Sequence, residues 1–318
     1  MLSNILKPSV KETENSTDWS IYLVDEPLMP NIDAVLEHQK MMERIGGQLV
    51  SLLSIIGSPY DTQLAVVNAI FDEDDKSFIK NELGGLMIDK TGDVLVALIK
   101  IIYNAFSIAV KAVLNLMTDY LGNFFSASIR LKNAAESLLN KVNKLNGKPK
   151  YEQVDINSDF GMVMTDHDEV DIALFTEGIS KQIEFLSAMV KEKASGKLRS
   201  KYYVKKELRG NPNFKGGDVD AFTVEEIRDY THRLMLDTVE VINLKRYTFP
   251  FLKSKSKYLT STIKEMKASN EVEAQKEVEE ARNEIDKIVE IIKSSTRLFT
   301  NQNKARYQLI LLMAKNIN

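Results

Sequence analysis

The sequence contains no cysteine, and among its 318 residues there are only 3 histidines and 1 tryptophan. A chain without cysteine can form no disulfide bond, no thiol nucleophile and no thiolate metal site. The histidines His38, His167 and His232 are too far apart in sequence for two of them to share a helix face as zinc ligands. These absences predict a protein that has no bound metal or cofactor and is made in a reducing compartment.

The sequence also lacks an uninterrupted apolar run of the roughly 20 residues that a membrane-spanning helix needs. Its most apolar segment is divided by Lys100 and Lys111, which leave only 101–110 free of charge between them. The first residues include one lysine but no apolar core of signal-peptide length, and a polar stretch follows at 11–18. We therefore expect no single membrane span, no secretion through a signal peptide, and synthesis in the cytoplasm.

No group of residues has the spacing of a familiar catalytic site. The cluster 166–169 (Asp-His-Asp-Glu) comes nearest, because a carboxylate can orient an imidazole for proton transfer. The same residues fit a solvated turn with a helix N-cap at Asp168, and we favour that interpretation. The acidic run 72–75 lacks the glycine and the distal glutamate of a calcium loop, which indicates a solvated charge run. The sequence therefore predicts a protein that is not an enzyme, unless dispersed carboxylates assemble a site.

Residues 94–121 are the most distinctive segment, because their polar residues follow one narrow line of a helix. These polar residues are Lys100, Asn104, Ser107, Lys111, Asn115 and Thr118. A helix that is apolar over most of its surface must be covered by other helices, another protein or lipid. We interpret the segment either as the buried centre of a bundle or as a helix whose apolar face meets a membrane after release. That packing or membrane face consists of Leu98, Ile102, Phe106, Val113 and Met117.

Turn and proline signals divide the chain into three parts. Residues 1–30 include Pro8, Pro27 and Pro30 and are expected to form an extended N-terminal arm. Residues 31–250 repeat apolar positions at helical spacing and are expected to form a helical bundle core that a break at Pro250 ends. Residues 251–318 carry an apolar stripe among dense Lys and Glu, which predicts a C-terminal helical arm that docks back or forms a coiled coil.

Strand signals are sparse in this sequence. Only 151–168 alternates apolar with polar or small residues, which predicts a short hairpin or an extended segment. The segment Thr223-Val224-Glu225-Glu226 indicates a helix N-terminus with its cap and early carboxylates. We therefore predict an all-α fold: an elongated multi-helix bundle with one long central apolar helix and a minor β element around 151–168.

A glycine-punctuated interval at 196–217 combines cations with the aromatic residues Tyr202, Tyr203 and Phe214. Its basic residues are Lys197, Arg199, Lys201, Lys205, Lys206, Arg209 and Lys215. Such a mixture is typical of surfaces that contact phosphate groups or anionic lipid. The alternative is a basic loop that pairs with the acidic part of the C-terminal arm. The net charge of -3 and the pI near 5.8 exclude no local patch, but they do not fit a protein that mainly coats nucleic acid.

One series of segments resembles a known family. It comprises Phe124-Phe125, Arg130-Leu131-Lys132, Ala134-Ala135, the turn Lys144-Leu145-Asn146-Gly147-Lys148-Pro149-Lys150, an alternating stretch and Phe175-Thr176-Glu177-Gly178-Ile179. Together, over about residues 90–195, these segments resemble the internal head proteins of large tailed bacteriophages. The resemblance implies a protein without catalytic residues that is packaged inside the capsid, is often trimmed at its N-terminus by a prohead protease, and leaves with the genome.

With this resemblance, we expect a non-enzymatic virion component inside a phage head that is delivered with the genome. Its expected partners are other virion proteins, further copies of itself, or packaged DNA through the basic loop, with membrane contact as an alternative. Two other functions also fit the sequence. One is a membrane-active helical protein whose apolar helix inserts on release, and the other is a scaffold or adaptor that dimerises through the C-terminal arm.

Overall fold

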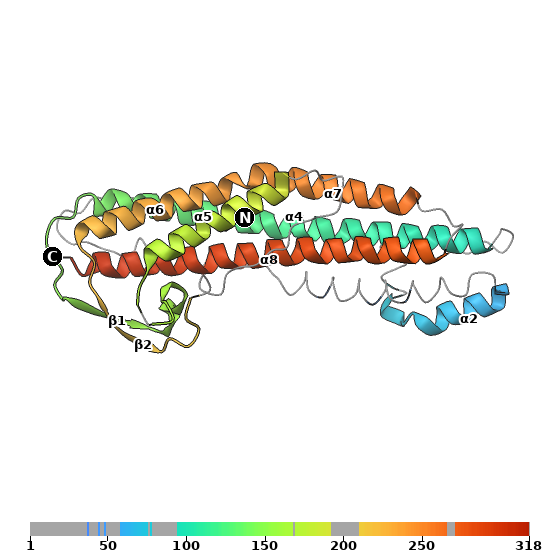
Figure 1. Ribbon diagram of the computed structural model, residues 1–318, viewed down its shortest axis with the longest axis horizontal. Helices are drawn as coiled ribbons and strands as arrows, with labels where there is room; N and C mark the ends of the chain where they lie inside the picture. The colour runs from blue at the N-terminus through green and yellow to red at the C-terminus, as the bar shows by residue number, and fades with distance from the viewer. Residues whose placement is uncertain are drawn as a thin grey trace, which may run out of the picture.

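The computed structural model describes residues 37, 44, 48, 58–75, 77, 94–167, 169–191, 210–265 and 271–317. This part of the chain is mostly helical, with six α-helices and one two-stranded antiparallel sheet (Figure 1). The elements are α2 (Tyr60–Ile70), α4 (Val94–Val142), β1 (Gln153–Asn157), the 3-10 helix η2 (Ser158–Val163), α5 (Ile172–Lys191), β2 (Gly216–Asp220), α6 (Val224–Asn243), α7 (Lys245–Glu265) and α8 (Glu271–Lys315). The prediction of a mostly helical fold with a minor β element is confirmed.

Two long helices, α4 and α8, run along the long axis of the molecule and contact each other (Figure 1). The 49 residues of α4 make a helix about 74 Å long at a rise of about 1.5 Å per residue. No proline interrupts it, and the chain turns away only at Gly147, whose φ of 149° few other residues adopt. The shorter helices α6 and α7 follow each other along α4, and α5 packs against α6, α7 and α8.

The apolar interior forms two clusters, one after the other along the axis. The first joins α4 to α5, α7 and α8, and it contains Val113 and Met117, which are 2% and 1% exposed. The second joins the C-terminal parts of α4 and α8 to α6 and the sheet. For Leu98, Ile102 and Phe106 the structure gives the helix, but their side chains lie outside the described part. No helix in the described ranges has the length and apolar content of a membrane span.

The predicted break at Pro250 is wrong, because this proline lies inside α7. The chain breaks instead at Leu244, whose carbonyl accepts hydrogen bonds from the N–H groups of Tyr247 (3.0 Å) and Thr248 (2.9 Å). Pro250 and the neighbouring Arg246 are both exposed, so water can bond the carbonyl that proline leaves without a donor. A proline on the solvent side of a helix is therefore tolerated here.

The predicted strand at 151–168 is correct only for its first part. β1 pairs with β2 in the register Gln153↔Asp220 to Asn157↔Gly216, while the chain beyond β1 forms η2. The partner strand β2 begins with the last two residues of the interval 196–217, which was expected to be a loop, and continues to Asp220. Gly216 is required there, because a Cβ at this position (φ 106°) would lie 2.8 Å from the carbonyl oxygen of Ile156.

The helix caps follow the sequence in one case and depart from it in another. The capping box at the start of α6 is confirmed, since Thr223 and Glu226 each accept a backbone N–H of the other. The N-cap expected at Asp168 is wrong, because Asp171 Oδ1 accepts the N–H of Leu174 (2.8 Å) and α5 begins after it. Asp171 stands directly before the first helical residue, where a cap side chain reaches the free N–H groups.

Candidate functional site

The buried side of α8 carries polar residues at positions that should be apolar. A repeat of alternating three- and four-residue steps runs along this side, and its members are at most 1% exposed. They are Ile288, Ile292, Ser295, Phe299, Gln302, Arg306, Leu309 and Met313. Three of these eight positions hold a polar side chain, each of which must find a partner because burial removes its water. We call Ser295, Gln302 and Arg306 the polar stripe of α8.

Among the residues that the structure describes, Arg306 is the largest fully buried side chain, and it joins three helices. Its Nη1 donates to Asp237 Oδ2 on α6 at 2.6 Å, and its Nη2 donates to Thr176 Oγ1 on α5 at 2.9 Å. Burial raises the pKa of the Asp237 carboxyl, and the charge of Arg306 opposes that rise. Burial likewise lowers the pKa of Arg306, against the attraction of Asp237. Each charge is therefore costly alone and compensated by the other.

Two further polar contacts join α8 to α5 and α4 beside the stripe. Gln182 Nε2 of α5 donates to Ser295 Oγ at 2.9 Å. The hydroxyls of Tyr120 on α4 and Thr296 lie 2.6 Å apart. Burial raises the pKa of Tyr120, and the hydrogen bond with Thr296 opposes the rise. The adjacent residues Ser295 and Thr296 of α8 thus contact two different helices, α5 and α4, at the same level of the bundle.

A second buried ion pair, Lys255 with Glu284, joins α7 to α8. The two side chains are 1% and 7% exposed. The Lys255 ammonium also lies 6.0 Å from the centre of the Phe251 ring and 5.5 Å from that of Tyr258, within the range of cation–π attraction. Together with the polar stripe and the Tyr120–Thr296 contact, this pair links α8 to α4, α5, α6 and α7.

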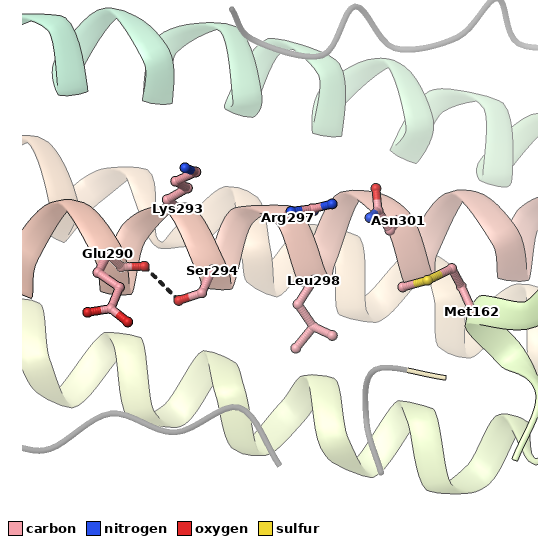
Figure 2. Close-up of a pocket in the computed structure, with 7 residues that line it drawn as sticks. All are labelled: Met162, Glu290, Lys293, Ser294, Arg297, Leu298 and Asn301. Atoms are coloured by element: carbon pink, nitrogen blue, oxygen red, sulfur yellow. Dashed lines mark hydrogen bonds between the residues drawn. The ribbon is translucent and has the colours of Figure 1, made fainter. Parts of the chain in front are cut away.

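A groove of about 450 Å³ lies along α8 (Figure 2). It is lined by Met162, Glu290, Lys293, Ser294, Arg297, Leu298 and Asn301. Lys293 and Asn301 project from one side of the helix, whereas Glu290, Ser294 and Leu298 project from the other. The Ser294 hydroxyl donates to the Glu290 carbonyl at 2.7 Å. This lining supplies charge and hydrogen bonds for binding, and Glu290 is the one carboxylate among the described residues that line it.

A second groove of about 420 Å³ separates the sheet from the C-terminal end of α8. Its lining residues are Asp155, Ile156, Asn157, Asp159, Phe160, Gln308, Leu311, Leu312 and Lys315. Beside it, the end of α8 is fixed to the chain that leaves α4: Asn316 Nδ2 donates to the Tyr151 carbonyl at 2.8 Å, and Asn316 Oδ1 accepts the Tyr151 N–H at 3.2 Å. The turn that carries the family resemblance therefore contacts the C-terminal end of α8.

Most of the predicted phosphate-binding residues cannot be placed. Those outside the described residues are Lys197, Arg199, Lys201, Lys205, Lys206 and Arg209. Lys215 is exposed directly before β2. Neither His167 nor His232 is buried, and no group of three or more His, Asp or Glu side chains within the described ranges is arranged to hold a metal ion.

The interpretation of the acidic run 72–75 as fully solvated is wrong for Asp75. This carboxylate is 0% exposed and accepts a hydrogen bond from Arg44 Nη2 at 2.6 Å. Its backbone N–H donates to Asp72 Oδ1 at 2.8 Å, which together with the charge of Arg44 lowers the pKa of Asp72. Asp75 therefore joins the acidic run to the segment of Arg44 through an internal ion pair.

Comparisons with known proteins identified no relative of this chain. No family model matches the chain, and neither the curated proteins nor the solved structures gave a match. A functional proposal has to start from the geometry of α8 and its contacts.

Proposed function

We propose that this chain is a non-enzymatic, helical structural component of a phage virion, packaged inside the head and delivered with the genome. The observation that carries the proposal is the polar stripe of α8, which sits at core positions of a 45-residue helix and bonds to its neighbours. A rod of this kind keeps its length and register through internal contacts. The resemblance of residues 90–195 to internal head proteins supplies the context.

The physical basis of the proposal is the difference between an apolar and a polar core position. Apolar side chains tolerate a helix that slides by one turn, because one leucine can replace another. Buried charges and amides are satisfied in a single register, since a slip leaves them desolvated without a partner. Arg306 would lose both Asp237 and Thr176 in such a slip. A rod with a fixed register suits a building block stored among many copies in a confined volume.

The two other functions make demands that the same contacts oppose. Membrane insertion of α4 requires its apolar face to separate from α6, α7 and α8, which it contacts over the described length. Dimerisation through α8 requires the side that already packs inside the chain. Neither function is favoured by a specific observation in the structure.

Purified particles test the proposal. Mass spectrometry of full particles should detect the chain at a constant copy number, and protease added to intact particles should leave it uncut. Particles emptied by osmotic shock should have lost the chain together with the DNA. Absence from full particles, or cleavage of the chain on intact ones, would contradict the proposal.

A further inference from the structure

The exposed charged side chains that the structure describes on α7 are all positive. Its exposed charged residues are Lys245, Arg246, Lys253 and Lys257. No acidic side chain is exposed on α7 within its described residues, and Arg246, Lys253 and Lys257 recur at steps of seven and four, which keeps them on one side of the helix. We call these four residues the α7 strip.

The α7 strip differs from the charged surfaces of the neighbouring helices. On each of α4, α5 and α6, one surface cation pairs with a carboxylate one turn away: Lys132 with Glu136, Lys181 with Glu177, and Arg233 with Asp229. The strip cations make no such pair with any residue that the structure describes. The buried cation of the same helix, Lys255, is paired with Glu284. Among the described side chains of α7, cations without a carboxylate partner therefore lie only on its outward side.

We propose that the α7 strip binds the phosphate backbone of double-stranded DNA. From Arg246 to Lys257 the strip extends about 17 Å at the α-helical rise of about 1.5 Å per residue. Duplex DNA presents one negative charge per about 1.7 Å of its axis, so a straight row of cations meets phosphates along its whole length. Such contacts depend on charge and not on base sequence. The inference stands on α7 alone and does not depend on the proposed place in a virion.

Anionic lipid fits the strip less well than DNA does. A helix that lies on a membrane places apolar side chains beside its cations, where they enter the acyl region. Phe251, Leu252 and Leu259 of α7 face the interior and are at most 3% exposed, and Tyr247, at 43%, is the one large apolar side chain that the structure describes as exposed on this helix. Nucleic acid needs only the cations.

A second copy of the chain is the other source of negative charge. Its sheet exposes Asp155 and Asp218 directly opposite each other, with Asp220 two residues further along β2. Neighbouring strands are about 5 Å apart and two residues span about 7 Å, so this acidic patch is compact. This acidic patch can meet only one end of the row of cations, which is about 17 Å long. DNA can meet the whole row.

Fluorescence anisotropy with a random-sequence duplex, followed from 50 to 200 mM salt, tests the inference. Four phosphate contacts predict a slope of log K against log salt of about -3.6, a loss of about 150-fold in affinity over that range. The variant Arg246→Gln/Lys253→Gln/Lys257→Gln should have a slope of about -0.9 and lose only about 3-fold to 4-fold. The charge-preserving variant Arg246→Lys/Lys253→Arg/Lys257→Arg should bind as the unmodified chain does.

The matched control is Lys144→Gln/Lys148→Gln/Lys150→Gln, which removes the same charge at the sheet end of the rod (Figure 1). It should keep most of the binding, and circular dichroism should show that all variants fold. An equal loss in the control, or no binding of the unmodified chain at 50 mM salt, would overturn the inference. Salt-sensitive self-association without DNA binding, or binding to anionic vesicles alone, would assign the strip to those partners and overturn it as well.

Discussion

At the scale of single residues, the protein places charged and polar side chains where an apolar core is expected. Arg306 and Asp237 come from positions 69 residues apart, and their contact removes both charges from water. A buried ion pair adds little net stability compared with apolar residues of the same volume, but removal of one partner leaves an uncompensated buried charge. The two members must therefore be altered together to keep the fold.

This dependence gives the first prediction. Asp237→Ala should lower the free energy of unfolding by about 3–5 kcal/mol, because it leaves the Arg306 guanidinium buried without its carboxylate. The double variant Asp237→Leu/Arg306→Met should recover most of that loss. Urea denaturation measures both. If Asp237→Ala were as stable as the unmodified chain, Arg306 would not be confined in the core.

Tyr120 gives a second prediction with a defined pH dependence. Its pKa is raised in the folded state by burial, so the folded chain holds this proton more tightly than the unfolded chain does. The resulting stability is complete below the ordinary tyrosine value of about 10 and is lost as the pH rises through the raised value. Tyr120→Phe should cost about 1 kcal/mol at pH 7 through the lost hydrogen bond to Thr296.

The difference between the two proteins should then shrink at high pH. Above about pH 10 the unmodified chain should lose stability faster than Tyr120→Phe. Thermal unfolding between pH 8 and 11 follows both proteins, and the comparison removes the effect of the other tyrosines. Parallel stability curves would contradict the buried position of this hydroxyl.

At the scale of elements, the helices could be read from the sequence more fully than the breaks between them. The periodicity of 94–121 and the capping box at Thr223 depend on neighbours along the chain, and both predicted real helices. No proline or glycine marks the break at Leu244 in the sequence, and the pairing of β2 with β1 depends on residues far away in sequence. Pro250 does not break its helix, because the effect of a proline depends on whether the side of the helix that carries it faces solvent.

The site could have been found only in part. The three-four repeat of α8 continues beyond Ile292 through Ser295, Gln302 and Arg306, which marks these polar residues as core positions. Only the apolar members of that repeat give a hydrophobic signal in the sequence. The partners of the stripe, Asp237 and Thr176, carry no local signal, because each lies on a different helix.

The crossing of two loops beside the sheet gives a third prediction. Gly210 has φ 71°, and a Cβ there would lie 2.4 Å from the Gly161 carbonyl oxygen. Gly210→Ala should destabilise the fold by at least about 1–3 kcal/mol through backbone strain alone. Gly217→Ala is the control, because a Cβ at Gly217 meets nothing within 4 Å. Equal urea midpoints for the two variants would contradict the close crossing.

At the scale of the whole molecule, the protein is a rod built around α8. Two apolar clusters follow each other along the axis, and α8 contributes to both. The polar stripe, the Tyr120–Thr296 contact and the Lys255–Glu284 pair fix the position of α8 against α4, α5, α6 and α7. The sheet, with its exposed Asp155, Asp218 and Asp220, lies near one end of this rod, and α7, which carries the α7 strip, lies away from that end (Figure 1). A helix in this position is an internal element of a single chain.

Hydrogen exchange followed by mass spectrometry tests this position of α8 most directly. Peptides from 281–317 should exchange as slowly as those from 110–142 of α4, and their rates should not change when the protein is diluted tenfold. Both segments should lose protection together in Asp237→Ala. Fast exchange in 281–317, or protection that grows with protein concentration, would show that α8 is an outer arm or a contact between chains.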